Sequence, residues 1–201
     1  MPTTELRRLL DDALSSSRPH AERLAISAAV VSAVLREHGM EATLVGGGAI
    51  EFHAGDVYTT SDIDLIVEGK SRAELDAALT GFGFARRGRH WVLGDLFVEV
   101  PGNWMPDPID VVSVGTLPLR VVKREVVLAD RVIGFKHWRA TAYGAQAAAL
   151  LALFGAGLDD MLLRERVRAE DAEDALDALR LLAAEGTHVT EDRLQALLDR
   201  L

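Results

Sequence analysis

The sequence predicts an α/β (α+β) protein, in which a small mixed β-sheet is flanked by helices and followed by a helical C-terminal region. Three observations support this fold class. Apolar residues recur with helical spacing near the N-terminus, short apolar or β-branched runs bounded by glycine and proline occupy the middle, and helical spacing returns from Leu128 onward. The expected division is a core with N-terminal helices over residues 1–127 and a helical region over residues 128–201.

Two helices are expected before the sheet. Residues 4–15 carry leucines on one side, and a second helix begins at Pro19 and runs to Glu37, consistent with proline in a first helical turn. A short strand over residues 43–45 follows. It ends at three glycines, and residues 49–53 have the pattern of a short helix after them.

The middle of the chain alternates helix and strand signals. Ser71 and Glu74 have the spacing of a capping box for a helix through about Leu79. Three strands are expected over residues 89–93, 96–100 and 109–114, and Gly94-Asp95 between the first two is a hairpin signal. Residues 103–108 contain two prolines and are expected to form a loop.

The C-terminal pattern is helical throughout. Residues 130–154 predict one long helix or two helices broken near Gly144, and residues 158–184 predict another. Thr190 has the position of an N-cap for a final helix over residues 191–201.

The segment with the most chemical information lies between residues 43 and 67. Gly46, Gly47 and Gly48, hereafter the glycine turn, stand where a strand meets a helix, and such junctions direct backbone N–H groups toward anions such as phosphate. Asp62 and Asp64 follow in an apolar strand, where residues two apart face the same side. Two adjacent carboxylates need a counter-charge, and Mg²⁺ is a divalent cation that takes carboxylate oxygens and substrate phosphates together.

This arrangement of a glycine turn, a short helix and a strand with Asp-x-Asp resembles the nucleotidyltransferase superfamily of the DNA polymerase β type. Gly47-Gly48 and Asp62-Ile63-Asp64 carry the resemblance, and residues 59–61 match the Thr/Ser positions that often precede the first aspartate. The similarity is greatest to small prokaryotic nucleotidyltransferase-like proteins, a group that includes components of toxin–antitoxin pairs.

The resemblance implies a third metal-binding carboxylate on a later strand. Glu99 and Asp110 are the two candidates, because each is an acid within an apolar strand. Glu99 is preferred, because it follows the Gly94 hairpin as the superfamily's third acid commonly follows a short hairpin, and Asp110 remains the alternative. The predicted catalytic and metal-binding set is therefore Asp62, Asp64 and Glu99, with Mg²⁺ or Mn²⁺.

The same resemblance implies nucleotide contacts. The glycine turn would bind phosphates through its backbone, and Ser61 or Thr60 would supply the hydroxyl that other members carry in a Gly-Ser form. Lys136 is the predicted cation for the pyrophosphate leaving group. His53 and His90 receive no role, because neither has a partner at a metal-ligand spacing.

Composition limits the partners. The net charge is −9, and there are no cysteines, which excludes a disulfide scaffold and thiolate metal sites. No apolar run approaches the roughly 20 residues of a membrane span, and the N-terminus lacks the pattern of a signal peptide. A cytoplasmic location without a membrane partner is expected.

The predicted function is metal-dependent transfer of an NMP from an NTP to a hydroxyl acceptor, with release of pyrophosphate. The acceptor classes are an RNA 3′ end such as that of tRNA, a protein, or a small molecule, and the acidic charge disfavours long RNA. A cognate antitoxin or a second copy of the chain are candidate partners. The alternative is a non-catalytic nucleotide-binding or partner-binding module on the same fold.

Overall fold

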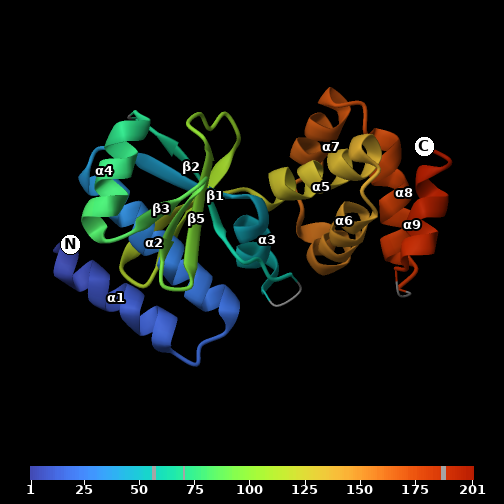
Figure 1. Cartoon of the computed structure of the whole chain (residues 1–201). Coiled ribbons are helices and arrows are strands. Elements are labelled where there is room, and N and C mark those ends of the chain that lie inside the picture. The colour runs from blue at the N-terminus through green and yellow to red at the C-terminus, as the bar shows by residue number, and fades with distance from the viewer. Residues whose placement is uncertain (56–57, 70, 187–188) are drawn as a thin grey trace. The chain divides into compact units, whose positions relative to one another are not determined.

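The computed structural model of the chain describes residues 1–55, 58–69, 71–186 and 189–201. It consists of two compact units, Met1–Lys123 and Arg124–Leu201 (Figure 1). The boundary falls four residues before the division expected from the sequence at 127/128, because helix α5 already begins at Arg124. Each unit has its own buried core.

The strands of the described residues in the first unit form one mixed sheet of seven strands, in the order β3-β4-β5-β2-β1-β7-β6. Their bounds are β1 Glu41–Val45, β2 Ile63–Glu68, β3 Ala85–Arg87, β4 His90–Leu93, β5 Leu96–Gly102, β6 Ile109–Val114 and β7 Leu117–Val122. β2 is the central strand and is antiparallel to β1 and parallel to β5. The hairpins β4–β5 and β6–β7 extend the sheet to either side.

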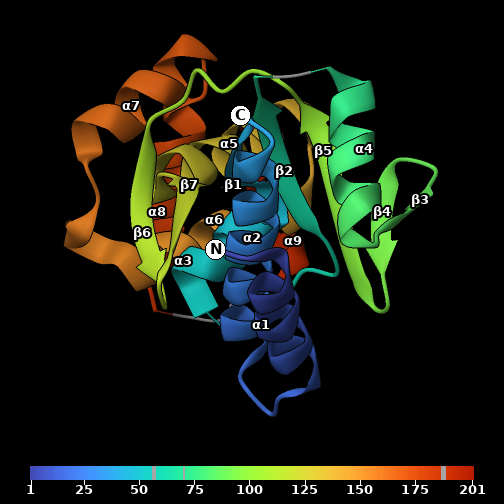
Figure 2. The ribbon, with the colours of Figure 1, turned by 90° about the vertical axis from the view of Figure 1, so that its left-hand side faces the viewer.

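Four helices of the described residues accompany this sheet: α1 Thr3–Ser15, α2 His20–Glu37, α3 Gly46–Ala54 and α4 Arg72–Phe82. α2 lies against the sheet, and α1 packs on its outer side (Figure 2). The predicted capping box of α4 is present, since the Ser71 side chain accepts from the Glu74 N–H and Glu74 reaches back to the Ser71 N–H. Both helices before the sheet, α1 and α2, agree with the sequence prediction within one residue.

Two strands had no counterpart in the sequence prediction. All three residues of β3 are exposed, so its sequence lacks the apolar alternation of a half-buried strand. β7 contains Pro118, which lowers the strand signal of a run because proline cannot donate to a ladder. β7 nevertheless joins β1 in parallel and β6 in antiparallel pairing.

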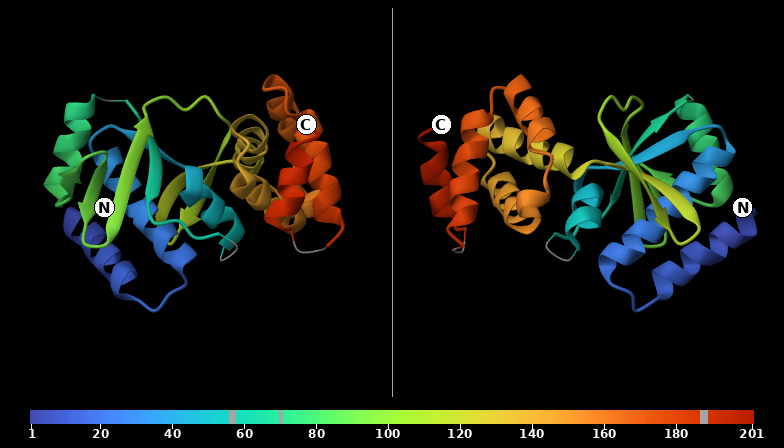
Figure 3. Two further views of the ribbon diagram at one scale, coloured as in Figure 1. Left: turned by 45° about the vertical axis from the view of Figure 1, so that its right-hand side comes forward. Right: turned by 180° about the vertical axis from the view of Figure 1, so that it is seen from behind.

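The second unit consists, in its described part, of short helices only: α5 Arg124–Trp138, α6 Thr141–Phe154, the 3₁₀ turn η2 Gly155–Gly157, α7 Asp160–Ala169, α8 Glu173–Ala184 and α9 Glu191–Leu198 (Figure 3). Their apolar faces form the core of the unit around Phe135, Leu163, Leu176 and Leu179. Among the helices of the described residues, none is long and apolar enough to cross a membrane.

Helix breaks in this unit differ from the predicted ones. The first break lies at Arg139, which has a positive φ of 51°, and Gly144 is inside α6 rather than at its end. A Cβ on Gly144 would lie 2.5 Å from Cδ2 of Phe135, so glycine is needed there for close packing of α5 against α6. The predicted helix over residues 158–184 is two helices separated at Asp171, whose φ is 50°.

Candidate functional site

Two aspartates stand at the start of the central strand, β2. Asp62 directly precedes β2 and Asp64 lies within it, and both are partly exposed. Ile63, Leu65 and Val67 alternate with them and are buried. Because residues two apart in a strand point to the same side, the two carboxylates lie on the face opposite the buried apolar side chains.

A third carboxylate, Glu99, lies on the adjacent strand β5. β2 and β5 are parallel, and Glu99 is the registered partner of Asp64. Registered partners in neighbouring strands point to the same face, so Glu99 lies on the face of the two aspartates. Asp110, the alternative third acid, is exposed on β6, and β1 and β7 separate β6 from β2. The structure therefore brings Glu99 to the aspartate pair and leaves Asp110 apart from it.

Two basic residues approach this cluster from the β3–β4 hairpin. Nε2 of His90 lies 3.3 Å from Oε2 of Glu99 and 3.7 Å from Oδ2 of Asp62. Nε of Arg89 lies 3.2 Å from the same Glu99 oxygen. Sequence reasoning gave His90 no role, although a signal existed. The two-residue turn at Gly94-Asp95 pairs residues 93 and 96, and counting back along both strands pairs His90 with Glu99.

The glycine turn joins β1 to α3 and lies beside the aspartates. Gly46 has a positive φ of 58°, and a Cβ on it would lie 2.4 Å from Oδ2 of Asp64. A Cβ on Gly47 would lie 2.9 Å from Oγ1 of Thr60. Among the described residues no side chain caps α3, so the N–H groups of its first turn are available to an anion. Glycine thus allows the backbone to lie directly against a carboxylate and to offer these N–H groups to a ligand.

A buried carboxylate on α3, Glu51, connects this helix to Asp62. Its side chain has 0% exposure, and Nδ1 of His20 lies 2.5 Å from Oε1. The other oxygen accepts the backbone N–H of Thr60 at 2.8 Å, and the Thr60 hydroxyl donates to Oδ1 of Asp62 at 3.1 Å. These contacts supply the partners that a buried carboxylate needs. Sequence reasoning missed both Glu51 and His20, because residues 31 positions apart form no local pattern.

The remaining predicted nucleotide contacts, Ser61 and Lys136, lie in different units. Ser61 is exposed and lines a pocket beside Asp62. Lys136 belongs to α5, where its ammonium donates to Oδ1 of Asp174 at 2.8 Å and to the backbone oxygen of Asp171. Partial burial raises the pKa of Asp174, but hydrogen bonds from Lys136 and from a backbone N–H outweigh it and hold that pKa below its ordinary value. Lys136 therefore has an ion pair within its own unit, and its nucleotide role stays a prediction.

Comparison with known proteins relates this geometry to a superfamily. Residues 25–79, which include the glycine turn and both aspartates, match a family described as a nucleotidyl transferase of unknown function. The crystal structure of an antigenic nucleotidyltransferase-like protein from Paracoccidioides brasiliensis matches with a TM-score of 0.52 and 12% identity, over 77% of this chain and 92% of that chain. This chain has a nucleotidyltransferase fold. The predicted superfamily and the α/β (α+β) fold class are thereby confirmed, and the toxin–antitoxin link stays a prediction.

Two structures of the antibiotic-resistance factor ANT(2'')-Ia are also similar. The solution structure has a TM-score of 0.48 and 18% identity, over 87% of this chain and 95% of that chain. The crystal structure with adenylyl-2''-tobramycin has a TM-score of 0.47 and 18% identity, over 71% and 95%. A search among curated proteins found no match. The nucleotidyltransferase assignment concerns the fold, and activity depends on the site itself.

Three side chains of the first unit are suited to holding a divalent metal ion. One ligand atom each from Asp62, His90 and Glu99 lies within 4.8 Å of the others, and all three side chains are partly exposed. Two carboxylate oxygens suit Mg²⁺ or Mn²⁺. The imidazole nitrogen favours Mn²⁺, because Mg²⁺ binds oxygen ligands almost exclusively. The residues present therefore fit the divalent cation that nucleotidyltransferases generally use.

Proposed function

We propose that the first unit is the catalytic core of a metal-dependent nucleotidyltransferase, which moves an NMP from an NTP to a hydroxyl acceptor and releases pyrophosphate. The main support is that Asp62, Asp64 and Glu99 share one face of the sheet next to the first turn of α3. Three acids in this arrangement need a cationic counter-charge, and free N–H groups at a helix N-terminus suit phosphate oxygens. Both requirements are met by a metal–triphosphate complex.

Each group has a separate role in this proposal. Asp62, Asp64 and Glu99 hold Mg²⁺ or Mn²⁺, and His90 is a further ligand beyond the set expected from the sequence. The metal, when bound, stabilises negative charge on the phosphates and on the leaving pyrophosphate. The N–H groups of the glycine turn bind the β- and γ-phosphate oxygens. Glu99 takes up the proton of the acceptor hydroxyl as its oxygen attacks the α-phosphorus.

Partners of the proposed enzyme follow from the same chemistry. The NTP is the donor, and an RNA 3′ end, a protein or a small molecule is the acceptor class. Lys136 is retained as the proposed cation for pyrophosphate, which would require it to exchange its ion pair with Asp174. A toxin–antitoxin setting and a homodimer are further proposals, supported only by the resemblance of the sequence.

A non-catalytic nucleotide-binding or partner-binding module is the second candidate. The observation that favours it is the environment of Glu99, whose Oε2 lies within 3.3 Å of nitrogen atoms of both Arg89 and His90. The guanidinium of Arg89 can neutralise the acid without a metal ion. A fold that balances its own carboxylates in this way can bind a partner or nucleotide without turnover.

The test is thermal unfolding of the wild type and of the double variant Asp62→Asn/Asp64→Asn, with each NTP and with Mg²⁺, Mn²⁺ or EDTA. A ligand that binds only the folded state stabilises it by about 2.7 kcal/mol at a hundredfold excess over Kd. A metal-dependent rise in Tm that the double variant loses would support NTP binding at these carboxylates. The Asp107→Asn/Asp110→Asn variant is the matched control, because it removes the same charge from a region outside the aspartate pair.

Turnover distinguishes the two candidates. Incubation of the wild type with α-³²P-labelled NTPs, Mn²⁺ and extracts of small molecules, RNA and protein should produce a labelled adduct and pyrophosphate if the protein is an enzyme. Metal-dependent binding without any labelled product or pyrophosphate would favour the non-catalytic module. Absence of nucleotide binding under every metal condition would contradict the enzyme and the nucleotide-binding module, and would leave a partner-binding module.

A further inference from the structure

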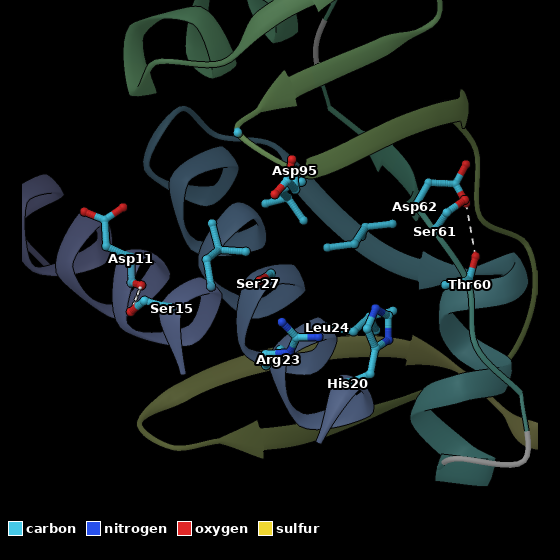
Figure 4. Close-up of a pocket in the computed structure, with 14 residues that line it drawn as sticks. Asp11, Ser15, His20, Arg23, Leu24, Ser27, Thr60, Ser61, Asp62 and Asp95 are labelled. Atoms are coloured by element: carbon cyan, nitrogen blue, oxygen red, sulfur yellow. Dashed lines mark hydrogen bonds between the residues drawn. The ribbon is translucent and has the colours of Figure 1, made fainter. Parts of the chain in front are cut away.

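Thr60 lies between the glycine turn and the carboxylate of Asp62, and it is buried, with 8% exposure. Its backbone N–H donates to Oε2 of Glu51 at 2.8 Å, and its hydroxyl donates to Oδ1 of Asp62 at 3.1 Å (Figure 4). A Cβ on Gly47 would lie 2.9 Å from the hydroxyl oxygen and 3.2 Å from Cβ of Thr60, so the glycine turn packs directly on this side chain. The backbone and the side chain of Thr60 are thus both held by α3.

Glu51 is the residue that holds the backbone of Thr60. Its side chain has 0% exposure, and each of its two oxygens has its own partner. Nδ1 of His20 lies 2.5 Å from Oε1, and Oε2 accepts the Thr60 N–H. His20 comes from α2 and borders the same pocket as Thr60 and Asp62 (Figure 4). A buried carboxylate with a partner on each oxygen is held in one orientation, so Glu51 fixes the segment before β2 to α3.

The two oxygens of Asp62 face different neighbours. Oδ1 accepts the hydrogen bond from Thr60. Oδ2 lies 3.7 Å from Nε2 of His90, and that nitrogen lies 3.3 Å from Oε2 of Glu99. A hydrogen bond to one oxygen of a metal-binding carboxylate fixes its orientation and leaves the other oxygen for the metal. The bond from Thr60 therefore presents Oδ2 on the side of the other proposed ligands.

We infer that Glu51 is a positioning residue, which holds the Thr60 backbone so that the Thr60 hydroxyl orients Asp62 for metal binding. The inference rests on the proposed function, in which Asp62, His90 and Glu99 hold a divalent metal ion. Glu51 touches neither the proposed ligands nor the substrate and acts only through Thr60. It couples the helix that carries the phosphate-binding turn to the carboxylate that binds the metal.

The competing explanation is that Glu51 only satisfies the buried N–H of Thr60. Removal of its side chain would then lower the stability of the fold and leave the metal affinity of the folded chain unchanged. Metal affinity is therefore the quantity that separates positioning from a purely structural role. It is measured at a temperature at which every variant is folded.

The test is calorimetric titration of the full chain with Mn²⁺, alone and in the presence of a non-hydrolysable ATP analogue. Thr60→Val removes the hydroxyl and keeps the shape of the side chain, so it should weaken Mn²⁺ binding roughly tenfold to a hundredfold. Thr60→Ser keeps the hydroxyl and should bind nearly as the wild type does. Glu51→Ala should weaken Mn²⁺ binding roughly tenfold. Glu51→Gln should weaken it less, because an amide oxygen can still accept the Thr60 N–H.

A double variant tests whether Glu51 acts through Thr60. Glu51→Ala/Thr60→Val should bind Mn²⁺ about as Thr60→Val alone does, because Glu51 has no hydroxyl left to position. Independent effects would multiply instead. A double variant whose loss equals the product of the two single losses would therefore overturn the inference.

Glu125 of the second unit provides the matched control. Its side chain is 6% exposed, and its Oε1 accepts the backbone N–H of Asp159 at 3.0 Å. Glu125→Ala therefore also removes the acceptor of a backbone N–H, but in the unit that carries none of the proposed metal ligands. Its Mn²⁺ affinity should equal that of the wild type. A loss as large as that of Glu51→Ala would show that destabilisation alone lowers the affinity, and would overturn the inference.

The inference is also overturned if Glu51→Ala or Thr60→Val binds Mn²⁺ as tightly as the wild type. If Glu51→Ala does not fold, Glu51→Gln takes its place in the double variant, and wild-type Mn²⁺ affinity in Glu51→Gln then overturns the inference. Failure of the proposed function gives a different result, because the wild type itself would bind neither Mn²⁺ nor its complex with the ATP analogue.

Discussion

Replacement of Gly46 by alanine should displace the carboxylate of Asp64 while the fold survives. Gly46 has a φ of 58°, a left-handed value that costs a residue with a Cβ about 1–2 kcal/mol. The new Cβ would lie 2.4, 3.1 and 3.2 Å from Oδ2, Cγ and Cβ of Asp64. Rotation of Asp64 off its rotamer moves Oδ2 and Cγ away at about 0.5–1.5 kcal/mol, and a shift of a few tenths of an ångström relieves the 3.2 Å contact with Cβ, which rotation does not move. The expected loss of unfolding free energy is about 1.5–3.5 kcal/mol.

Gly115→Ala separates the backbone cost from the clash. Gly115 has a similar φ of 60° in the β6–β7 turn, and no atom lies within 4 Å of its Cβ position. It should lose only about 1–2 kcal/mol. Both variants are measured by urea unfolding with linear extrapolation, and the rise in Tm with Mn²⁺ and ATP is recorded for each.

The decisive comparison is the response to ligand. Gly46→Ala should lose most of the metal-dependent rise in Tm, because the displaced Asp64 carboxylate no longer faces the site. Gly115→Ala should keep the full rise. The reasoning is refuted if the two variants lose the same stability and both keep the full rise in Tm with Mn²⁺ and ATP. Binding would then not require Asp64 to lie against the glycine turn.

Three further predictions concern other carboxylates and His90. Glu51→Ala should lower the unfolding free energy by about 1–3 kcal/mol, because the buried N–H of Thr60 loses its acceptor. Glu51→Gln should lower it less. Urea unfolding measures both losses, and equal losses in the two variants would contradict this account. His90→Gln should weaken Mn²⁺ binding in calorimetry more than Mg²⁺ binding, because it removes the nitrogen donor, and equal weakening would argue against a role of His90 as ligand. The pKa of Asp160 lies below its ordinary value because Arg180 donates a hydrogen bond to its carboxylate. The charged carboxylate therefore stabilises the folded chain at pH values above the ordinary carboxyl pKa. That stabilisation is lost as the pH falls through the lowered pKa of the folded state. Asp160→Asn should therefore reduce the acid-induced loss of stability below about pH 4, and urea midpoints over a pH series that match the wild type would count against it.

Local sequence patterns predicted the elements whose formation depends on near neighbours. The capping box at Ser71 and Glu74 requires residues three apart, and both hydrogen bonds are present. The hairpin at Gly94-Asp95 likewise depends on a two-residue turn, and it fixes the β4–β5 register. Helix α2 was predicted from its apolar spacing and from Pro19, which occupies its N-cap position.

Errors occurred where packing outweighs local preference. Gly144 was expected to mark a helix break, whereas it lies inside α6 because Phe135 of α5 occupies the space of a Cβ. The observed breaks at Arg139 and Asp171 use left-handed backbone, and neither residue is a glycine or a proline, the residues that mark breaks most strongly in a sequence. β3 was missed because an exposed strand has no apolar alternation to reveal it.

The sequence alone determined the glycine turn, the Asp62 and Asp64 pair and the superfamily resemblance, because these depend on spacing within one continuous segment. Only the tertiary structure decided that Glu99 rather than Asp110 faces that pair, because parallel pairing of β2 with β5 sets a register that no local pattern contains. The same holds for Glu51. Its environment is made by His20 and Thr60 from other segments of the chain, so its burial and its hydrogen bonds are consequences of packing.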